Sequence, residues 1–210
     1  MREDLIFYTN PQSRGRIVRW MLEEVGVAYK TVVLDYGAGM KSVEYLAINP
    51  MGKVPVIVHN GNVVTEGAAI CAYLAEVFPA AGLLPQTMKE KANYYRWLFF
   101  AAGPLESALT NKRVFAEEPD AEKERMLGYG NYEYTLSTLA MAVKANPFIA
   151  GERFTAADVY VGSHIGWGMQ FGTLEKREAF VDYFARLQQR PALKRAAELD
   201  DALVEKASET

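Results

Sequence analysis

The spacing of apolar residues follows two patterns along the chain, and the pattern changes near residue 79. Before that point, short apolar runs alternate with stretches of helical periodicity. Strands are predicted at residues 5–8, 29–34, 56–58 and 63–65. Helices are predicted at residues 13–25, 42–48 and 66–79. This βαβαββα order predicts a small α/β domain at residues 1–79.

The rest of the chain has helical periodicity. We expect helices at residues 88–109, 121–144, from Thr155, at 176–189 and at 191–204. Pro104 should kink the first of these helices, because it has no N–H to donate to the carbonyl of Phe100. Pro79, Gly82 and Pro85 mark a linker, which we place at residues 80–87. Residues 88–210 are then expected to form one all-helical domain.

One stretch, residues 49–70, joins several structural signals in a small space. A Gly-Lys-Val-Pro turn leads into a short strand, and Asn60-Gly61 is a strong signal for a two-residue hairpin. After the second strand, Glu66 opens a helix. The unit therefore presents a backbone edge at Val54 and a carboxylate at a helix N-terminus, an arrangement suited to holding a peptide-like molecule.

Composition and charge narrow the possible partners. The 210 residues are 50% apolar and 23% charged, as in ordinary globular proteins, and the net charge of −3 with a pI near 5.6 argues against a nucleic-acid partner. The longest apolar run, residues 97–102, is too short to span a membrane. Residues 1–4 lack the apolar core of a secretory signal, so we expect a cytoplasmic protein.

The cysteine and histidine content excludes two further kinds of site. A single cysteine, Cys71, permits neither an internal disulfide nor a Cys-x-x-Cys redox pair. With only His59 and His164 as imidazole donors, the sequence predicts no metal site.

Taken together, these motifs resemble the cytosolic glutathione transferase family, in particular its bacterial members. The resemblance covers essentially the whole chain: the βαβαββα half, the Gly-Lys-Val-Pro turn, the Thr65-Glu66 lead into a helix, and a Thr-Ala-Ala-Asp box at residues 155–158. It implies a thioredoxin-like N-terminal domain, a helical C-terminal domain, and a homodimer. It also implies that glutathione is a co-substrate bound on the first domain and that no cofactor is bound permanently. A hydrophobic electrophile is expected between the domains, in a site formed by the helical domain.

Ser13 is the candidate catalytic residue that the resemblance implies. It follows Tyr8 by five residues, at the loop-to-helix junction where relatives place a catalytic Ser or Cys. Its structural alternative is an N-cap for the first helix. Asn10 and Arg14 are candidate supporting donors. A tyrosine mechanism through Tyr8 is a weaker alternative, because Tyr8 lies at a strand end, and Cys71 is not at the Ser13 position.

The resemblance also implies how glutathione is held. Val54 pairs its main chain with the cysteinyl peptide, and Pro55 is expected to be cis. Glu66 accepts the γ-glutamyl amine, and Lys53 is a candidate partner for the glycine carboxylate. Gly67 stands where the family usually has Ser, so a hydroxyl donor is missing and we expect weaker or differently arranged binding.

These residues lead to an enzymatic hypothesis. We expect conjugation of glutathione thiolate to hydrophobic electrophiles, as in detoxification, with glutathione-dependent peroxidase activity as a side reaction of some relatives. The alternative is a non-catalytic binding or stress-regulatory protein on the same fold, and Gly67 keeps that alternative open.

Overall fold

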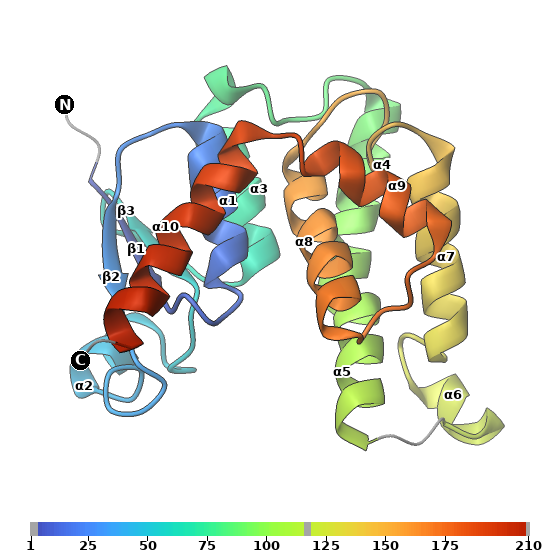
Figure 1. Cartoon of the computed structure of the whole chain (residues 1–210), viewed down its shortest axis with the longest axis horizontal. Coiled ribbons are helices and arrows are strands. Elements are labelled where there is room, and N and C mark those ends of the chain that lie inside the picture. The colour runs from blue at the N-terminus through green and yellow to red at the C-terminus, as the bar shows by residue number, and fades with distance from the viewer. Residues whose placement is uncertain (1–3, 116–118, 209–210) are drawn as a thin grey trace. The chain divides into compact units, whose positions relative to one another are not determined.

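A computed structural model describes residues 4–115 and 119–208 of the chain (Figure 1). The chain divides into two compact units. The first unit combines residues 1–82 with residues 190–210, and the second comprises residues 83–189.

A four-stranded mixed sheet forms the centre of the first unit. Its order is β2 (Lys30–Val33), β1 (Leu5–Thr9), β3 (Val56–His59) and β4 (Asn62–Val64). β1 is parallel to β2 and antiparallel to β3. Between β3 and β4, Asn60 and Gly61 have φ angles of 49° and 83°, as a two-residue hairpin requires, so the predicted hairpin is confirmed.

The helices of the first unit complete the predicted βαβαββα order. They are α1 (Gly15–Val25), α2 (Val43–Ile48), α3 (Gly67–Val77) and the short 3₁₀ helix η1 (Pro79–Ala81). α1 buries Ile17, Trp20 and Met21, and it packs against α3. The thioredoxin-like fold expected for this unit is confirmed.

The C-terminal helix α10 (Pro191–Ser208) differs from the expected division of the chain. The sequence placed it in the helical domain of residues 88–210, but it packs on α1 in the first unit. The reason is a contact across a long sequence separation: Arg19 of α1 and Asp200 of α10 are both buried and pair with each other. The two residues are 181 positions apart, so periodicity alone does not reveal the contact.

The second unit is helical. Its elements are α4 (Met88–Phe100), the π-helical segment η2 (Ala101–Leu105), α5 (Glu106–Phe115), α6 (Ala121–Met126), α7 (Tyr132–Ala145), α8 (Ala156–Phe171) and α9 (Glu178–Leu187). The irregularity expected at Pro104 takes the form of the π-helical segment, which contains this proline. Within the described part of the chain, no helix is long and apolar enough to cross a bilayer.

The single helix predicted at residues 121–144 is wrong. Two helices, α6 and α7, occupy this stretch. Gly130 has a φ of 68°, a left-handed conformation that interrupts helical hydrogen bonding. Asn131 then caps α7 by accepting a hydrogen bond from the N–H of Tyr134 at 2.8 Å.

The Thr-Ala-Ala-Asp box forms a capping box at the start of α8. The buried Asp158 carboxylate accepts four hydrogen bonds: from the N–H of Ile149 (2.7 Å), the hydroxyl of Tyr183 (2.8 Å), and the N–H and hydroxyl of Thr155 (2.8 and 3.0 Å). Burial raises the pKa of Asp158 to about 6, and the four donors act in the opposite direction. The carboxylate thus joins α8, α9 and the preceding loop at one point.

We predict that Asp158→Asn destabilises the protein by about 1.5–3 kcal/mol, because an amide turns an N–H toward backbone donors that need an acceptor. Urea unfolding followed by circular dichroism measures the loss. Asp120→Asn is the matched control, since exposed Asp120 also caps a helix, through the N–H groups of Glu122 and Lys123, and Asn caps equally well. Equal midpoints for the two variants would contradict the prediction.

Candidate active site

The loop between β1 and α1 carries Ser13 and is tied to β2 through Asn10. The Asn10 side chain donates to the carbonyl of Leu34 at 2.8 Å, and its Oδ1 accepts from the N–H of Gln12 at 2.9 Å. The Asn10 carbonyl accepts from both the N–H and the Oγ of Ser13, at 3.1 and 2.7 Å. In this structure Asn10 therefore orders the loop.

The hydroxyl of Ser13 has two partners within the chain. It donates to the Asn10 carbonyl, and it accepts from the N–H of Gly15 at 2.9 Å, so it satisfies one of the first donors of α1. Rotation about the Cβ–Oγ bond turns the hydrogen away from Asn10 while Oγ still accepts from Gly15. Gly15 has no room for a side chain, because a Cβ there would lie 2.0 Å from Thr9 Oγ1.

The alternatives considered for Ser13 have different surroundings. Tyr8 is half-buried and packs on the ring of Tyr45, with 5.5 Å between ring centroids. Arg14 is exposed at the start of α1. Cys71 is fully buried in α3, and burial raises the pKa of its thiol far above neutrality, which disfavours a thiolate at this position.

The turn before β3 leaves the main-chain N–H and C=O of one residue, Val54, open. The Val54–Pro55 bond is cis, as expected. The carbonyl of Lys53 accepts from the hydroxyl of Tyr45 (2.7 Å) and the amide of Asn49 (2.8 Å), which fixes the turn. Burial raises the pKa of Tyr45 to about 12, so this hydroxyl stays a donor. In residues 4–115 and 119–208, Val54 makes no backbone hydrogen bond, and both its N–H and C=O are available.

Glu66 precedes α3 in a strained conformation. Its φ of 64° and ψ of 115° are unusual for a residue with a side chain, and such strain typically costs about 1–3 kcal/mol and clusters at binding sites. The side chain of Glu66 is exposed and makes no cap hydrogen bond to the start of α3. The N–H groups at Gly67 and the next two residues therefore form an open anion site beside the Glu66 carboxylate.

The strand register brings these pieces to the same edge of the sheet. Tyr8, near the end of β1, pairs with Val56, the first residue of β3. Val64, the last residue of β4, pairs with Ile57. The Ser13 loop, the Val54–Pro55 turn and the start of α3 all follow or precede these strand ends directly. Lys53 is exposed on the same turn.

Comparison with known proteins shows the family of the chain. Residues 3–76 match the family described as "Glutathione S-transferase, N-terminal domain". The chain is 32% identical to glutathione S-transferase GstA of Escherichia coli O157:H7, over 76% of this chain and 77% of that protein. It is 33% identical to a glutathione S-transferase of Arabidopsis thaliana, over 66% and 68% of the two chains.

A solved structure gives the same result. The structure of a sphingomonad glutathione S-transferase complexed with glutathione superposes with a TM-score of 0.74 at 25% identity, covering 93% of this chain and 98% of the other. The chain belongs to the glutathione transferase family and is similar to its bacterial members.

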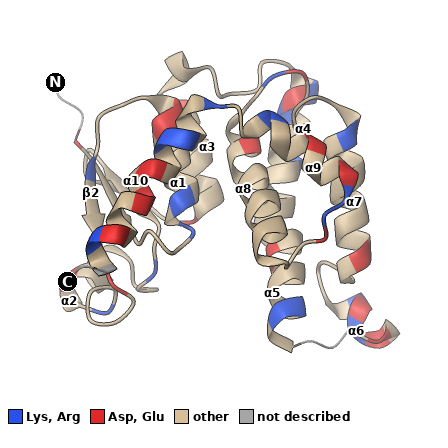
Figure 2. Cartoon of the chain, in the orientation of Figure 1, with Lys and Arg blue, Asp and Glu red and all other residues tan. Residues whose placement is uncertain are grey.

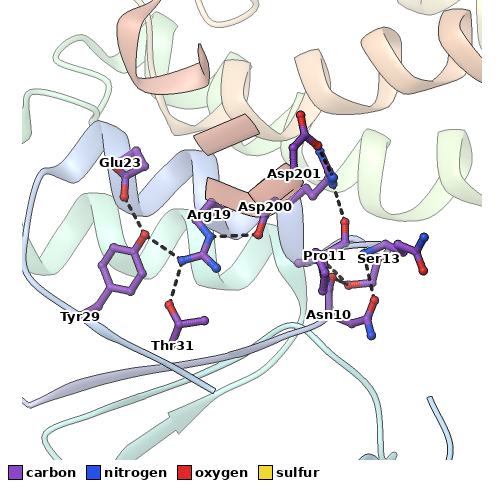
Figure 3. A network of polar contacts seen from close by, with 12 residues as sticks. Asn10, Pro11, Ser13, Arg19, Glu23, Tyr29, Thr31, Asp200 and Asp201 are labelled. Atoms are coloured by element: carbon purple, nitrogen blue, oxygen red, sulfur yellow. Dashed lines mark hydrogen bonds and ion pairs between the residues drawn. The ribbon is translucent and has the colours of Figure 1, made fainter. Parts of the chain in front are cut away.

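Sequence reasoning missed the residues that hold the site in shape. Tyr36 donates its hydroxyl to the carbonyl of Gln12 at 2.9 Å, and Arg16 donates Nε to the carbonyl of Pro11 at 2.5 Å. The Arg16 side chain also pairs with Asp201 of α10. Figure 3 shows Asp201 together with Pro11 and Ser13 of the loop. These side chains carried no sequence signal, since each reaches a carbonyl or a carboxylate whose position depends on the folded loop.

Proposed function

We propose that the protein is a glutathione transferase that conjugates glutathione to hydrophobic electrophiles. The observation that carries the proposal is the meeting of an open peptide edge, an exposed carboxylate beside an uncapped helix N-terminus, and a serine hydroxyl at one sheet edge. Glutathione has the complementary groups: a cysteinyl peptide for Val54, a γ-glutamyl amine for Glu66, an adjacent carboxylate for the first turn of α3, and a thiol for Ser13. Lys53 pairs with the glycine carboxylate.

Ser13 has the chemistry to favour the thiolate. In the proposed complex its hydroxyl turns from Asn10 toward the sulfur and keeps the bond from Gly15. A hydrogen bond to a charged group is worth about 1.5–3 kcal/mol, and about 1.36 kcal/mol shifts a pKa by one unit. A thiol with a pKa near 8.5 would then ionise roughly one to two units lower. The positive end of the α1 dipole acts in the same direction.

The thiolate is the nucleophile in the proposed reaction. Its electron pair forms a carbon–sulfur bond, and the electrophile releases a leaving group such as chloride, so no redox partner is required. Reduction of organic hydroperoxides is the proposed secondary activity: the thiolate attacks the terminal peroxide oxygen, the O–O bond breaks and an alcohol leaves. A second glutathione then attacks the resulting sulfenic acid, which gives glutathione disulfide and water. We assign the hydrophobic electrophile to the helical unit, and we propose a detoxification role in the cytoplasm.

A non-catalytic binding or stress-regulatory role is the competing proposal. Two observations favour it: the Ser13 hydroxyl already has an acceptor in Asn10, and Gly67 offers no hydroxyl to the ligand. Retention on glutathione-agarose followed by conjugation of chlorodinitrobenzene separates the two. Retention without turnover would support the competing role, and failure of both would refute the enzyme.

We predict that Ser13→Ala lowers kcat/KM for chlorodinitrobenzene roughly ten- to a hundredfold near pH 6.5, because the thiolate loses a charged hydrogen bond. The pH profile of kcat/KM should move upward by about one to two units. Ser137→Ala is the control, since exposed Ser137 also makes a local hydrogen bond, to Glu133. An unchanged pH profile in Ser13→Ala would transfer the donor role to Asn10 or Arg14.

We predict that Gly67→Ser tightens glutathione binding by about five- to tenfold, because a serine hydroxyl adds one hydrogen bond to the ligand carboxylate. Isothermal titration calorimetry measures the dissociation constant. Gly67→Ala is the matched control, because it adds the same Cβ without a hydroxyl donor. If the alanine variant binds as tightly as the serine variant, the missing hydroxyl is not what limits affinity.

We also propose a homodimer formed through α4. Met88, Tyr95 and Phe99 are 82%, 46% and 73% exposed, and their spacing places them on one face of this helix. A second copy of the chain covers such a face in a symmetric interface. Phe99→Asp is predicted to halve the mass measured by analytical ultracentrifugation, whereas Met141→Asp, at 63% exposure on α7, leaves it unchanged. A wild-type monomer would overturn this assignment.

A further inference from the structure

The C-terminal helix α10 is joined to α1 by ion pairs along its length. Charged residues of both signs lie on the two helices (Figure 2). The pairs are Arg16–Asp201 (2.7 Å), Arg19–Asp200 (3.1 Å), Glu23–Arg195 and Glu24–Arg190 (2.6 Å). As the residue number rises along α1 it falls along α10, so the helices run antiparallel. The Asp201 end of α10 consequently lies at the start of α1, where the Ser13 loop ends.

Arg16 connects that end of α10 to the loop itself. Its Nη2 donates to Asp201 Oδ1 at 2.7 Å, and its Nε donates to the carbonyl of Pro11 at 2.5 Å. The guanidinium is planar, so its N–H groups point in fixed directions. A carboxylate that accepts from one N–H therefore also fixes the direction of the others. The bond to Asp201 in this way directs the Nε–H of Arg16 toward the Pro11 carbonyl.

The Pro11 carbonyl lies in the middle of the loop that presents Ser13. The carbonyl before it, on Asn10, accepts from Ser13, and the carbonyl after it, on Gln12, accepts from the Tyr36 hydroxyl. Within the described residues, the Pro11 carbonyl accepts its hydrogen bond from Arg16. Loss of that donor would free the centre of the loop while both ends stay anchored.

We propose that Asp201 is a positioning residue for the Ser13 loop, and that it acts through Arg16. The proposal rests on the proposed function, because it concerns the alignment of the Ser13 hydroxyl with the glutathione sulfur. Asp201 is separated from Arg16 by 185 positions in the sequence. The last helix of the chain thus contributes to the geometry of a site built from the first loop.

The test compares two ion pairs on the same two helices. Asp201→Ala removes the pair next to the loop, and Arg195→Ala removes the Glu23 pair toward the other end of α1. Arg16→Lys keeps the positive charge but loses the planar fork. Asp201→Asn keeps an acceptor of the same shape and should rescue most of the function. Full-length variants are assayed for conjugation against pH, for glutathione affinity by calorimetry, and for thermal unfolding.

Asp201→Ala and Arg16→Lys are expected to lower kcat/KM about fivefold and to move its acidic limb upward by about half a unit, since a misaligned hydroxyl stabilises the thiolate less. Arg195→Ala should change the melting temperature as much as Asp201→Ala but leave the pH profile in place. Equal profiles for Asp201→Ala and Arg195→Ala in an active enzyme would overturn the positioning role. If the wild type neither binds glutathione nor conjugates it, the proposed function itself fails.

Discussion

The buried pair between Arg19 and Asp200 is the contact on which the first unit depends. The two side chains are 4% and 1% exposed, and the guanidinium also donates to Tyr29 and Thr31 at 3.0 and 2.8 Å. The Cζ atom of Arg19 lies 5.0 Å from the centroid of the Phe7 ring. Burial raises the pKa of Asp200, and the positive charge of Arg19 opposes the rise. Removing one partner of such a pair typically costs about 3–5 kcal/mol, because the other charge stays buried.

This ion pair has a consequence for chemistry because of where α1 begins. The loop of Asn10 to Ser13 leads directly into α1, so whatever fixes α1 also fixes the serine. The sheet holds the other two parts of the candidate site, since the register of β1, β3 and β4 sets where the cis-proline turn and Glu66 lie. The packing of α1 thus positions Ser13, and the pairing of the strands positions the turn and Glu66 at the same edge of the sheet. Neither alone would assemble the site.

Features encoded locally could be predicted from the sequence. The hairpin at Asn60-Gly61 requires two left-handed residues, and the Thr155 to Asp158 box satisfies N–H donors within one helical turn. Each could therefore be predicted from a few neighbouring residues. The break at Gly130 was missed because flanking residues favour helix, and the left-handed glycine prevails only in the folded chain. The burial of Arg19 was missed for a different reason: its partner lies 181 positions away, beyond the reach of periodicity.

The residues that fix the geometry of the candidate site could not be predicted from the sequence, for the same reason as the burial of Arg19. Ser13, Val54 and Glu66 stand in recognisable motifs, whereas Tyr36, Tyr45 and the α10 aspartates act on carbonyls or charges of distant segments. Nothing in their local sequence distinguishes them from surface residues.

Because α10 belongs to the first unit, that unit is assembled from both ends of the chain. In topological terms the helical unit, residues 83–189, is an insertion between α3 and α10. During synthesis the first 82 residues emerge without the helix that neutralises buried Arg19, and the inserted unit is complete before they are. The first unit therefore closes only after α10 has been made, so the unit whose synthesis begins first is completed after the inserted one.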